Sequence, residues 1–200
     1  MLPVVIAVEG IDDDQRAVFA GNLASQIERS GAADVVVVRS NIMRMCWGAE
    51  QDSEEDVRMN CRLRAAALMH AMIAGIGEAR KSDAGVVILD GYALTNLALG
   101  REYGHEEHTR RVQEMFCESA HITFAVYSKA ESSTLHRKIR NSYFATAINY
   151  SLSSDEDEVR GAVAPVIMIQ NDGHNFLREL TSSLDLVDSL IKKHYMHVLG

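Results

Sequence analysis

Five short apolar runs, separated by stretches with helical periodicity, constrain the fold of this 200-residue chain more than any other feature. The runs are rich in β-branched residues and nearly continuous, which is typical of strands covered on both faces of a parallel sheet. They span residues 4–8, 34–39, 85–90, 121–127 and 164–170. Helical patterns span residues 16–29, 54–80, 106–119, 129–140 and 175–194. This alternation predicts an α/β three-layer sandwich, a five-stranded and mostly parallel sheet with helices on both faces.

Length and composition narrow the class of protein. The chain fits one domain, residues 1–200, and no apolar run reaches the length of about 18 residues that a membrane span needs. The net charge of -8 argues against a nucleic-acid partner. The first ten residues lack a basic leader and a cleavage site, so they are expected to form a strand rather than a signal peptide. Neither the three scattered cysteines nor the eight histidines show metal-ligand spacing, so we expect a cytoplasmic protein without a metal site.

The stretch VVIAVEGIDDDQRAVFAGNL (4–23) has the layout of a phosphate-binding loop, with an apolar run, a glycine, a loop and a helix. Aligned with G-x-x-x-x-G-K-[ST], Gly10 takes the first glycine, Gln15 the second and Arg16 the lysine. Ala17 takes the position of the hydroxyl residue and has no oxygen for a magnesium ion. Gln15 also brings a Cβ where the backbone would approach the phosphates.

Two carboxylates in the loop are a stronger objection to phosphate binding. Asp13 or Asp14 placed about 4 Å from a phosphate charge costs on the order of 4 kcal/mol at an effective dielectric near 20. We expect one of these two carboxylates to cap the helix that begins near Gln15, in the space of a β-phosphate. ATP binding is therefore predicted to be weak, and a strand–loop–helix without any ligand is the alternative for the loop alone.

The same residues carry a resemblance to a known family. VEGIDDDQRA resembles the thymidylate kinase signature, in which E-G-I-D precedes a glycine-rich loop and G-K-T, and residues 9–12 match it. VVILDGYALTNLALG is similar to the second motif of that family, with Asp90 and Tyr92 kept and Gly91 in place of an arginine. HITFAVYSKAESSTLHRKIRN is similar to the next strand and the basic helix leading into the lid. The resemblance covers residues 4–141.

The resemblance implies site residues, which fall into three groups. The expected phosphate-loop residues are Gly10, Asp13, Asp14, Gln15, Arg16 and Ala17. The expected catalytic residues are Arg16, Asp90 and the arginines Arg137 and Arg140, which lie at the start of a lid-like segment at 137–161. The expected substrate-binding residues are Asp12 for the sugar, Arg39 for the acceptor phosphate, Tyr92, and Arg62 or Arg64. Arg62 and Arg64 are two positions apart on a helix, so they face different directions.

Function follows from the resemblance and from the departures from it. Enzymes of the family transfer the γ-phosphoryl group of ATP to dTMP or another deoxynucleoside monophosphate. If this chain is active, the resemblance implies magnesium and ATP as cofactors; if it is inactive, no cofactor is expected. Arg16, Ala17 and Gly91 each replace a group that such chemistry uses, so the activity is expected to be weak or lost. The alternative is a pseudoenzyme that senses nucleotide, binds protein or has a structural role. A homodimer or a protein partner remains open, as does an inhibitor or assembly protein without a ligand.

Overall fold

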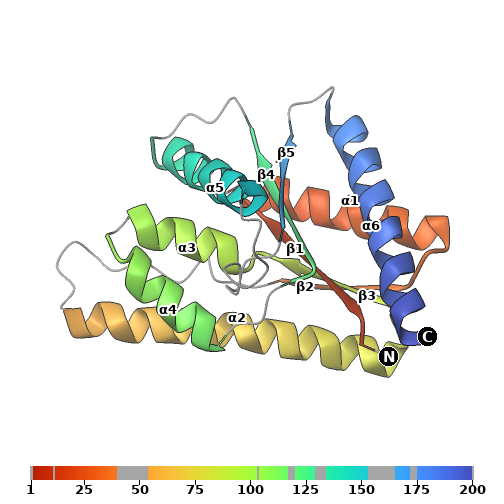
Figure 1. Ribbon diagram of the computed structural model, residues 1–200, viewed down its shortest axis with the longest axis horizontal. Helices are drawn as coiled ribbons and strands as arrows, with labels where there is room; N and C mark the ends of the chain where they lie inside the picture. The colour runs from red at the N-terminus through yellow and green to blue at the C-terminus, as the bar shows by residue number, and fades with distance from the viewer. Residues whose placement is uncertain are drawn as a thin grey trace.

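The computed structural model describes residues 2–10, 12–39, 54–102, 104–116, 120–128, 134–152, 165–171 and 175–199 (Figure 1). The strands are β1 (Val4–Glu9), β2 (Val35–Arg39), β3 (Val86–Asp90), β4 (Ile122–Tyr127) and β5 (Val166–Gln170). The helices are α1 (Asp13–Ser30), α2 (Glu54–Ser82), α3 (Ala93–Glu102), α4 (Glu106–Phe116), α5 (Thr134–Leu152) and α6 (Phe176–Leu199). All five predicted strands are present, with boundaries close to those predicted.

The strands form one sheet in the order β2-β3-β1-β4-β5, and every neighbouring pair is parallel. The first and third apolar runs are neighbours in the sheet, with Val4 of β1 in register with Val86 of β3. All six residues of β1 and all five of β3 are buried. These two strands lie inside the sheet and are covered on both faces, which is why their sequences are continuously apolar rather than alternating.

Helices cover both faces of the sheet, as the sequence predicts (Figure 1). On one face, Val4, Ile6 and Val8 pack in a core with residues of α1 and α6, among them Phe19 and Val187. On the other face, alternate residues of the central strands pack against α2, and the core there extends to α3 and α4. A third cluster joins α3 and α5 to β4 and β5. Alternate residues of β1 therefore enter different cores, in keeping with the two-residue period of a strand.

Three helices differ from the pattern that the sequence predicts. α1 begins at Asp13, three residues early, because Asp12 caps it. α3 is a separate helix that periodicity does not reveal, since it is buried on nearly all sides and has no polar face. α5 continues to Leu152, beyond the predicted end of the helical pattern at residue 140, because buried Tyr143 extends the apolar face of Ile139 by one turn. Residues 41–52 and 153–161 lie outside the described residues.

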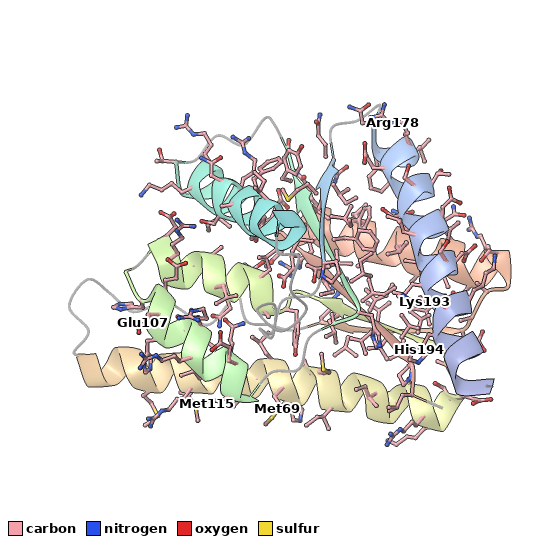
Figure 2. All side chains as sticks on the ribbon, in the orientation of Figure 1. Met69, Glu107, Met115, Arg178, Lys193 and His194 are labelled. Atoms are coloured by element: carbon pink, nitrogen blue, oxygen red, sulfur yellow. The ribbon has the colours of Figure 1, made fainter. Side chains whose placement is uncertain are left out.

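The two ends of the described chain meet at the amino edge of the sheet (Figure 1). His194 of α6 approaches the carbonyl oxygen of Leu2 through Nε2 at 3.0 Å, and Figure 2 labels this side chain near the C-terminal end of α6. The ring of His194 also meets that of His121, which precedes β4, with 5.2 Å between centroids. Within the described part of the chain, no helix is long and apolar enough to cross a membrane.

Candidate functional site

Three neighbouring strands bring several of the predicted site residues to one edge of the sheet. The register places Asp90, at the end of β3, beside Val8 of β1 and beside Arg39 of β2. The carboxyl ends of parallel strands meet at the same edge, which is where α/β proteins of this kind bind ligands. The loop that follows β1 and the start of α1 lie at this edge as well.

The start of α1 is capped by a carboxylate, but not by either of the two that were expected. Oδ1 of Asp12 accepts hydrogen bonds from the backbone N–H groups of Asp14 (3.1 Å) and Gln15 (3.0 Å). Its Oδ2 accepts from the side-chain Nε2 of Gln15 at 3.2 Å. Asp12 has the extended backbone of an N-cap, whereas Asp13 and Asp14 are already helical. The prediction that Asp13 or Asp14 caps the helix was therefore wrong, because Asp12 is the cap.

Arg16 is buried and contacts Asp90 at the end of β3 as well as Gly10 and Asp13 of the loop. Its Nε donates to Oδ1 of Asp90 at 2.5 Å, and its Nη1 donates to the carbonyl oxygen of Gly10 at 2.9 Å. The same Nη1 lies 2.8 Å from Oδ1 of Asp13. Burial disfavours the charge on Arg16, but the hydrogen bond and charge of Asp90, with the charges of Asp13 and Glu9, outweigh it and raise the pKa of Arg16. The guanidinium is therefore a permanent cation inside the loop.

The surroundings of Gly10 in the loop require a glycine. A Cβ built there would lie 2.9 Å from the carbonyl oxygen of Val126 on β4, which is closer than side chains tolerate. Ala17 follows Arg16 in the first turns of α1 and brings no oxygen to the edge. The loop thus keeps the tight exit from β1 while lacking the hydroxyl that a magnesium ion would use.

Asp90 connects the loop to β2, and its surroundings do not fit a magnesium ion. Oδ1 accepts from Arg16, and Oδ2 lies 3.4 Å from Nε of Arg39, whose side chain is 73% exposed. Magnesium needs oxygen ligands in octahedral geometry. Both oxygens of Asp90 face arginines, and the side chain of Ala17 has no oxygen. This arrangement therefore provides few oxygen ligands for a magnesium ion. The described residues also contain no group of three His, Cys, Asp or Glu side chains that could hold a metal.

The remaining predicted residues lie on α2, on α5 and in the turn before α3. Arg64 is buried with 1% of its surface exposed, whereas Arg62 is exposed, so only Arg64 points into the fold. Tyr92 is also buried, and its hydroxyl lies 3.7 Å from the sulfur of Met72. The edge of the sheet, the turn before α3 and the interior side of α2 therefore carry Asp90, Arg39, Tyr92 and Arg64.

The two arginines expected from the lid-like segment lie on α5. Arg137 is exposed, and its Nη2 donates to the hydroxyl of Thr134 on the same helix at 3.4 Å. Arg140 is partly buried one turn further along. The segment expected to act as a lid is thus helical as far as Leu152. Residues 153–161, its acidic part, lie outside the described residues.

Glu9 is a polar residue of this edge to which sequence reasoning assigned no role. It is completely buried, and its Oε1 accepts from the backbone N–H of Leu94 at 2.8 Å. Its Oε2 accepts from the N–H (3.3 Å) and the hydroxyl (2.6 Å) of Thr95. Burial raises the pKa of Glu9, whereas these bonds and the charge of Arg16 act in the opposite direction. The signal in the sequence was a glutamate that closes a wholly apolar strand.

Asn96, the next residue of α3, was missed because α3 was missed. Its side chain is completely buried, and neither Oδ1 nor Nδ2 has a hydrogen-bond partner in the described part of the chain. A buried amide without partners costs about 1–3 kcal/mol, so such groups are rare in folded proteins. The surrounding structure therefore does not explain why the carboxamide oxygen and NH2 group of Asn96 are buried.

Comparisons with known proteins give a fold. No family model matches the sequence, and no curated protein sequence matches it. Among solved structures, the thymidylate kinase from Ehrlichia chaffeensis is similar, with a TM-score of 0.62 at 13% sequence identity. The similarity spans 94% of this chain and 100% of that chain. The chain therefore has a thymidylate-kinase-like fold.

Proposed function

We propose that this chain binds a deoxynucleoside monophosphate at the carboxyl edge of the sheet and transfers phosphoryl groups from ATP weakly or not at all. The proposal treats the two halves of a kinase site separately. The donor half is the loop at the start of α1. The acceptor half is made by the ends of β2 and β3, the interior side of α2 and the first turn of α3.

The observation that carries the proposal is the placement of Arg16. In a phosphate loop, the cation at this position interacts with the β- and γ-phosphates. Here the guanidinium donates to Asp90 and Gly10 and pairs with Asp13. ATP could recruit Arg16 only by breaking these buried contacts, and breaking one side of a buried pair costs about 3–5 kcal/mol.

The start of α1 supports the same conclusion. A helix N-terminus attracts an anion because its first N–H groups lack partners. Two of these groups, at Asp14 and Gln15, already donate to the carboxylate of Asp12. An incoming phosphate would have to displace that carboxylate or share the site with its charge. Asp12, expected to hold the sugar of the acceptor, is engaged in this cap instead.

The acceptor half is supported by charges and by an unpartnered amide. Arg39 is exposed beside Asp90, and Arg64 points inward from α2. Arginine forms paired, charge-assisted hydrogen bonds with phosphate. The buried carboxamide of Asn96 offers a donor and an acceptor side by side, which is the pattern that asparagine uses to read the edge of a base. A monophosphate also carries less negative charge than ATP, so its repulsion by the carboxylate of Asp13 is smaller.

Titration calorimetry with dTMP, dTTP and ATP, each with and without magnesium, tests the proposal. We expect dTMP to bind more tightly than ATP. The dissociation constant of ATP–magnesium should exceed about 1 mM, which corresponds to a binding free energy near 4 kcal/mol. A coupled assay with ATP and dTMP should give little turnover. Micromolar binding of ATP, or efficient turnover, would show that Arg16 leaves its contacts readily and that the donor half functions.

Two matched pairs of variants test the acceptor half. Arg39→Ala should weaken dTMP binding about tenfold or more, the typical effect of losing a charge-assisted bond, whereas Arg101→Ala at the far end of α3 should not. Arg64→Met should weaken binding, and Arg62→Met on the exposed side of the same helix should not. No heat with dTMP from a folded protein, or equal effects within each pair, would contradict the acceptor site.

A protein-binding role is favoured by one separate observation, an exposed apolar stripe on α2. Met59, Leu63 and Ile73 are 53%, 54% and 60% exposed, and their spacing places them on one face of the helix. Met115 of α4, which Figure 2 labels, is also exposed, at 75%. Large apolar side chains exposed along one face of a helix are typical of interaction surfaces. We propose that a second copy of the chain covers this stripe.

The order of residues along α2 favours a second copy over another partner. An antiparallel crossing centred near His70 places Leu63 opposite Gly77, where a built Cβ meets nothing within 4 Å, and Ala66 opposite Ala74. Large against small residues allows close packing of two helices. The same crossing brings Arg62 opposite exposed Glu78, so that both ends of the contact gain an ion pair by symmetry.

A further inference from the structure

Glu9, Thr95 and Tyr143 form a buried chain of hydrogen bonds that joins three elements. The hydroxyl of Thr95 on α3 lies 2.6 Å from Oε2 of Glu9, the last residue of β1. It lies 2.7 Å from the hydroxyl of Tyr143 on α5. All three side chains are at most 1% exposed. The bonded residues are far apart in the sequence: Glu9 and Thr95 are separated by 86 positions, and Thr95 and Tyr143 by 48.

The number of protons fixes the direction of these bonds. Both oxygens of Glu9 accept, from the N–H groups of Leu94 and Thr95 and from the hydroxyl of Thr95. Thr95 has one hydroxyl proton, and the bond to Glu9 uses it. The hydroxyl proton of Tyr143 is then the one that lies between Tyr143 and Thr95. Each member therefore holds the next in a defined orientation, ending at the carboxylate.

These hydrogen bonds act on the first turn of α3. Glu9 holds the backbone at Leu94 and Thr95, and Asn96 is the next residue. α5 also contacts α3 through an apolar cluster that contains Ile139, Leu94 and Ala98, and apolar contacts are not directional. Lys138 of α5 pairs with Glu102 at 3.1 Å, at the opposite end of α3 from its first turn. Hydrogen bonds of 2.6–2.7 Å fix rotation and sliding far more closely.

We propose that Tyr143 and Thr95 are positioning residues for base selection: through Glu9 they fix the first turn of α3 and thereby the carboxamide of Asn96. This inference rests on the proposed monophosphate site and adds to it the residues that set its discrimination among bases. None of the three needs to touch the nucleotide. Tyr143 in particular acts from α5, outside the motifs that end β1 and β3.

The test compares the relative affinities of the four common deoxynucleoside monophosphates, measured by calorimetry. Tyr143→Phe keeps the ring and removes one buried oxygen. It should reduce the ratio of the tightest to the weakest affinity by about threefold to tenfold, the typical effect of losing one hydrogen bond. Thr95→Val should do the same, whereas Thr95→Ser keeps a hydroxyl and should retain the wild-type ratio. Ser183→Ala removes a comparably buried hydroxyl of α6 and is the matched control.

A purely structural role would weaken all four affinities equally and leave their ratio unchanged, and that result would overturn the inference. If the wild-type protein binds none of the four, the proposed function fails, and amide hydrogen exchange then decides the positioning separately. Faster exchange at Leu94 and Thr95 in Tyr143→Phe, but not in Ser183→Ala, would support it. Unchanged exchange at these two amides would refute it.

Discussion

Arg16 and Asp90 form the most consequential pair of side chains at the carboxyl edge. Asp90 is 2% exposed, and its other cationic neighbour, Arg39, is 73% exposed and 3.4 Å away. Arg16→Met should therefore reduce the free energy of unfolding by about 3–5 kcal/mol, because it leaves a buried carboxylate without its main partner. Urea denaturation measures this change.

A surface pair provides the control for that prediction. Arg101 faces Glu106 at 3.6 Å with both side chains half exposed, so Arg101→Met should change the free energy of unfolding by at most about 1 kcal/mol. The double variant Arg16→Met/Asp90→Leu removes both buried charges and should recover much of the loss. Equal effects of Arg16→Met and Arg101→Met would mean that the buried pair does not stabilise the fold.

His121 should make the stability depend on pH. Burial and the nearby His194 lower the pKa of His121 below its ordinary 6.5, and Nδ1 accepts from the N–H of Val5 at 3.0 Å. The unfolded chain then takes up a proton first as the pH falls. The free energy of unfolding should therefore decrease below about pH 6.5 and keep its full His121 contribution above it.

His121→Asn tests this dependence, because the amide oxygen can still accept from Val5 but does not titrate. Urea denaturation between pH 5 and 8 should give a flatter curve than the wild-type protein. His194→Asn should remove a smaller part of the slope, since burial is the larger cause at His121. A His121→Asn curve that follows the wild type would assign the slope to other groups.

The packing of α3 on α4 depends on Gly100. A Cβ at this position would collide with the side chain of Thr109, whose Cβ would lie 2.9 Å away. Gly100→Ala should therefore reduce the free energy of unfolding by about 1–3 kcal/mol through overpacking. Gly21 of α1 has nothing within 4 Å of a built Cβ, so Gly21→Ala should instead stabilise the chain by about 0.5–1 kcal/mol. Thermal or urea denaturation that ranks the two variants the other way would contradict this account.

The elements differ in how much of them the sequence could predict. β1 and β3 were evident because residues buried on both faces must all be apolar, which leaves a local pattern. The burial of Arg64 rather than Arg62 could not be predicted, because either arginine could face inward as far as the local sequence is concerned. Only the packing of α2 on the sheet decides which of the two is buried. Asp12 could have been preferred over Asp13 as the cap only with knowledge of where the extended backbone ends. The partnership of Thr95 with Tyr143 depends on topology alone.

The whole molecule should be a dimer if the stripe on α2 is covered by a second copy. Light scattering after size exclusion should give twice the mass of the chain. Leu63→Glu, within the stripe, should give the mass of one chain. Leu177→Glu should not, because Leu177 is a similarly exposed leucine, at 71%, that lies on α6 outside the stripe. A wild-type protein with the mass of a single chain would contradict the proposed contact.

Asp12 and Glu9 have a consequence for how the folded state responds to its surroundings. A dissolved anion that binds only the folded chain stabilises it in proportion to the logarithm of the anion concentration. A tethered carboxylate acts instead at a fixed effective concentration set by the backbone. At the starts of α1 and α3, the carboxylates of Asp12 and Glu9 already accept from the helix amides. The stability gained at these two helix starts is thus independent of dilution or dialysis.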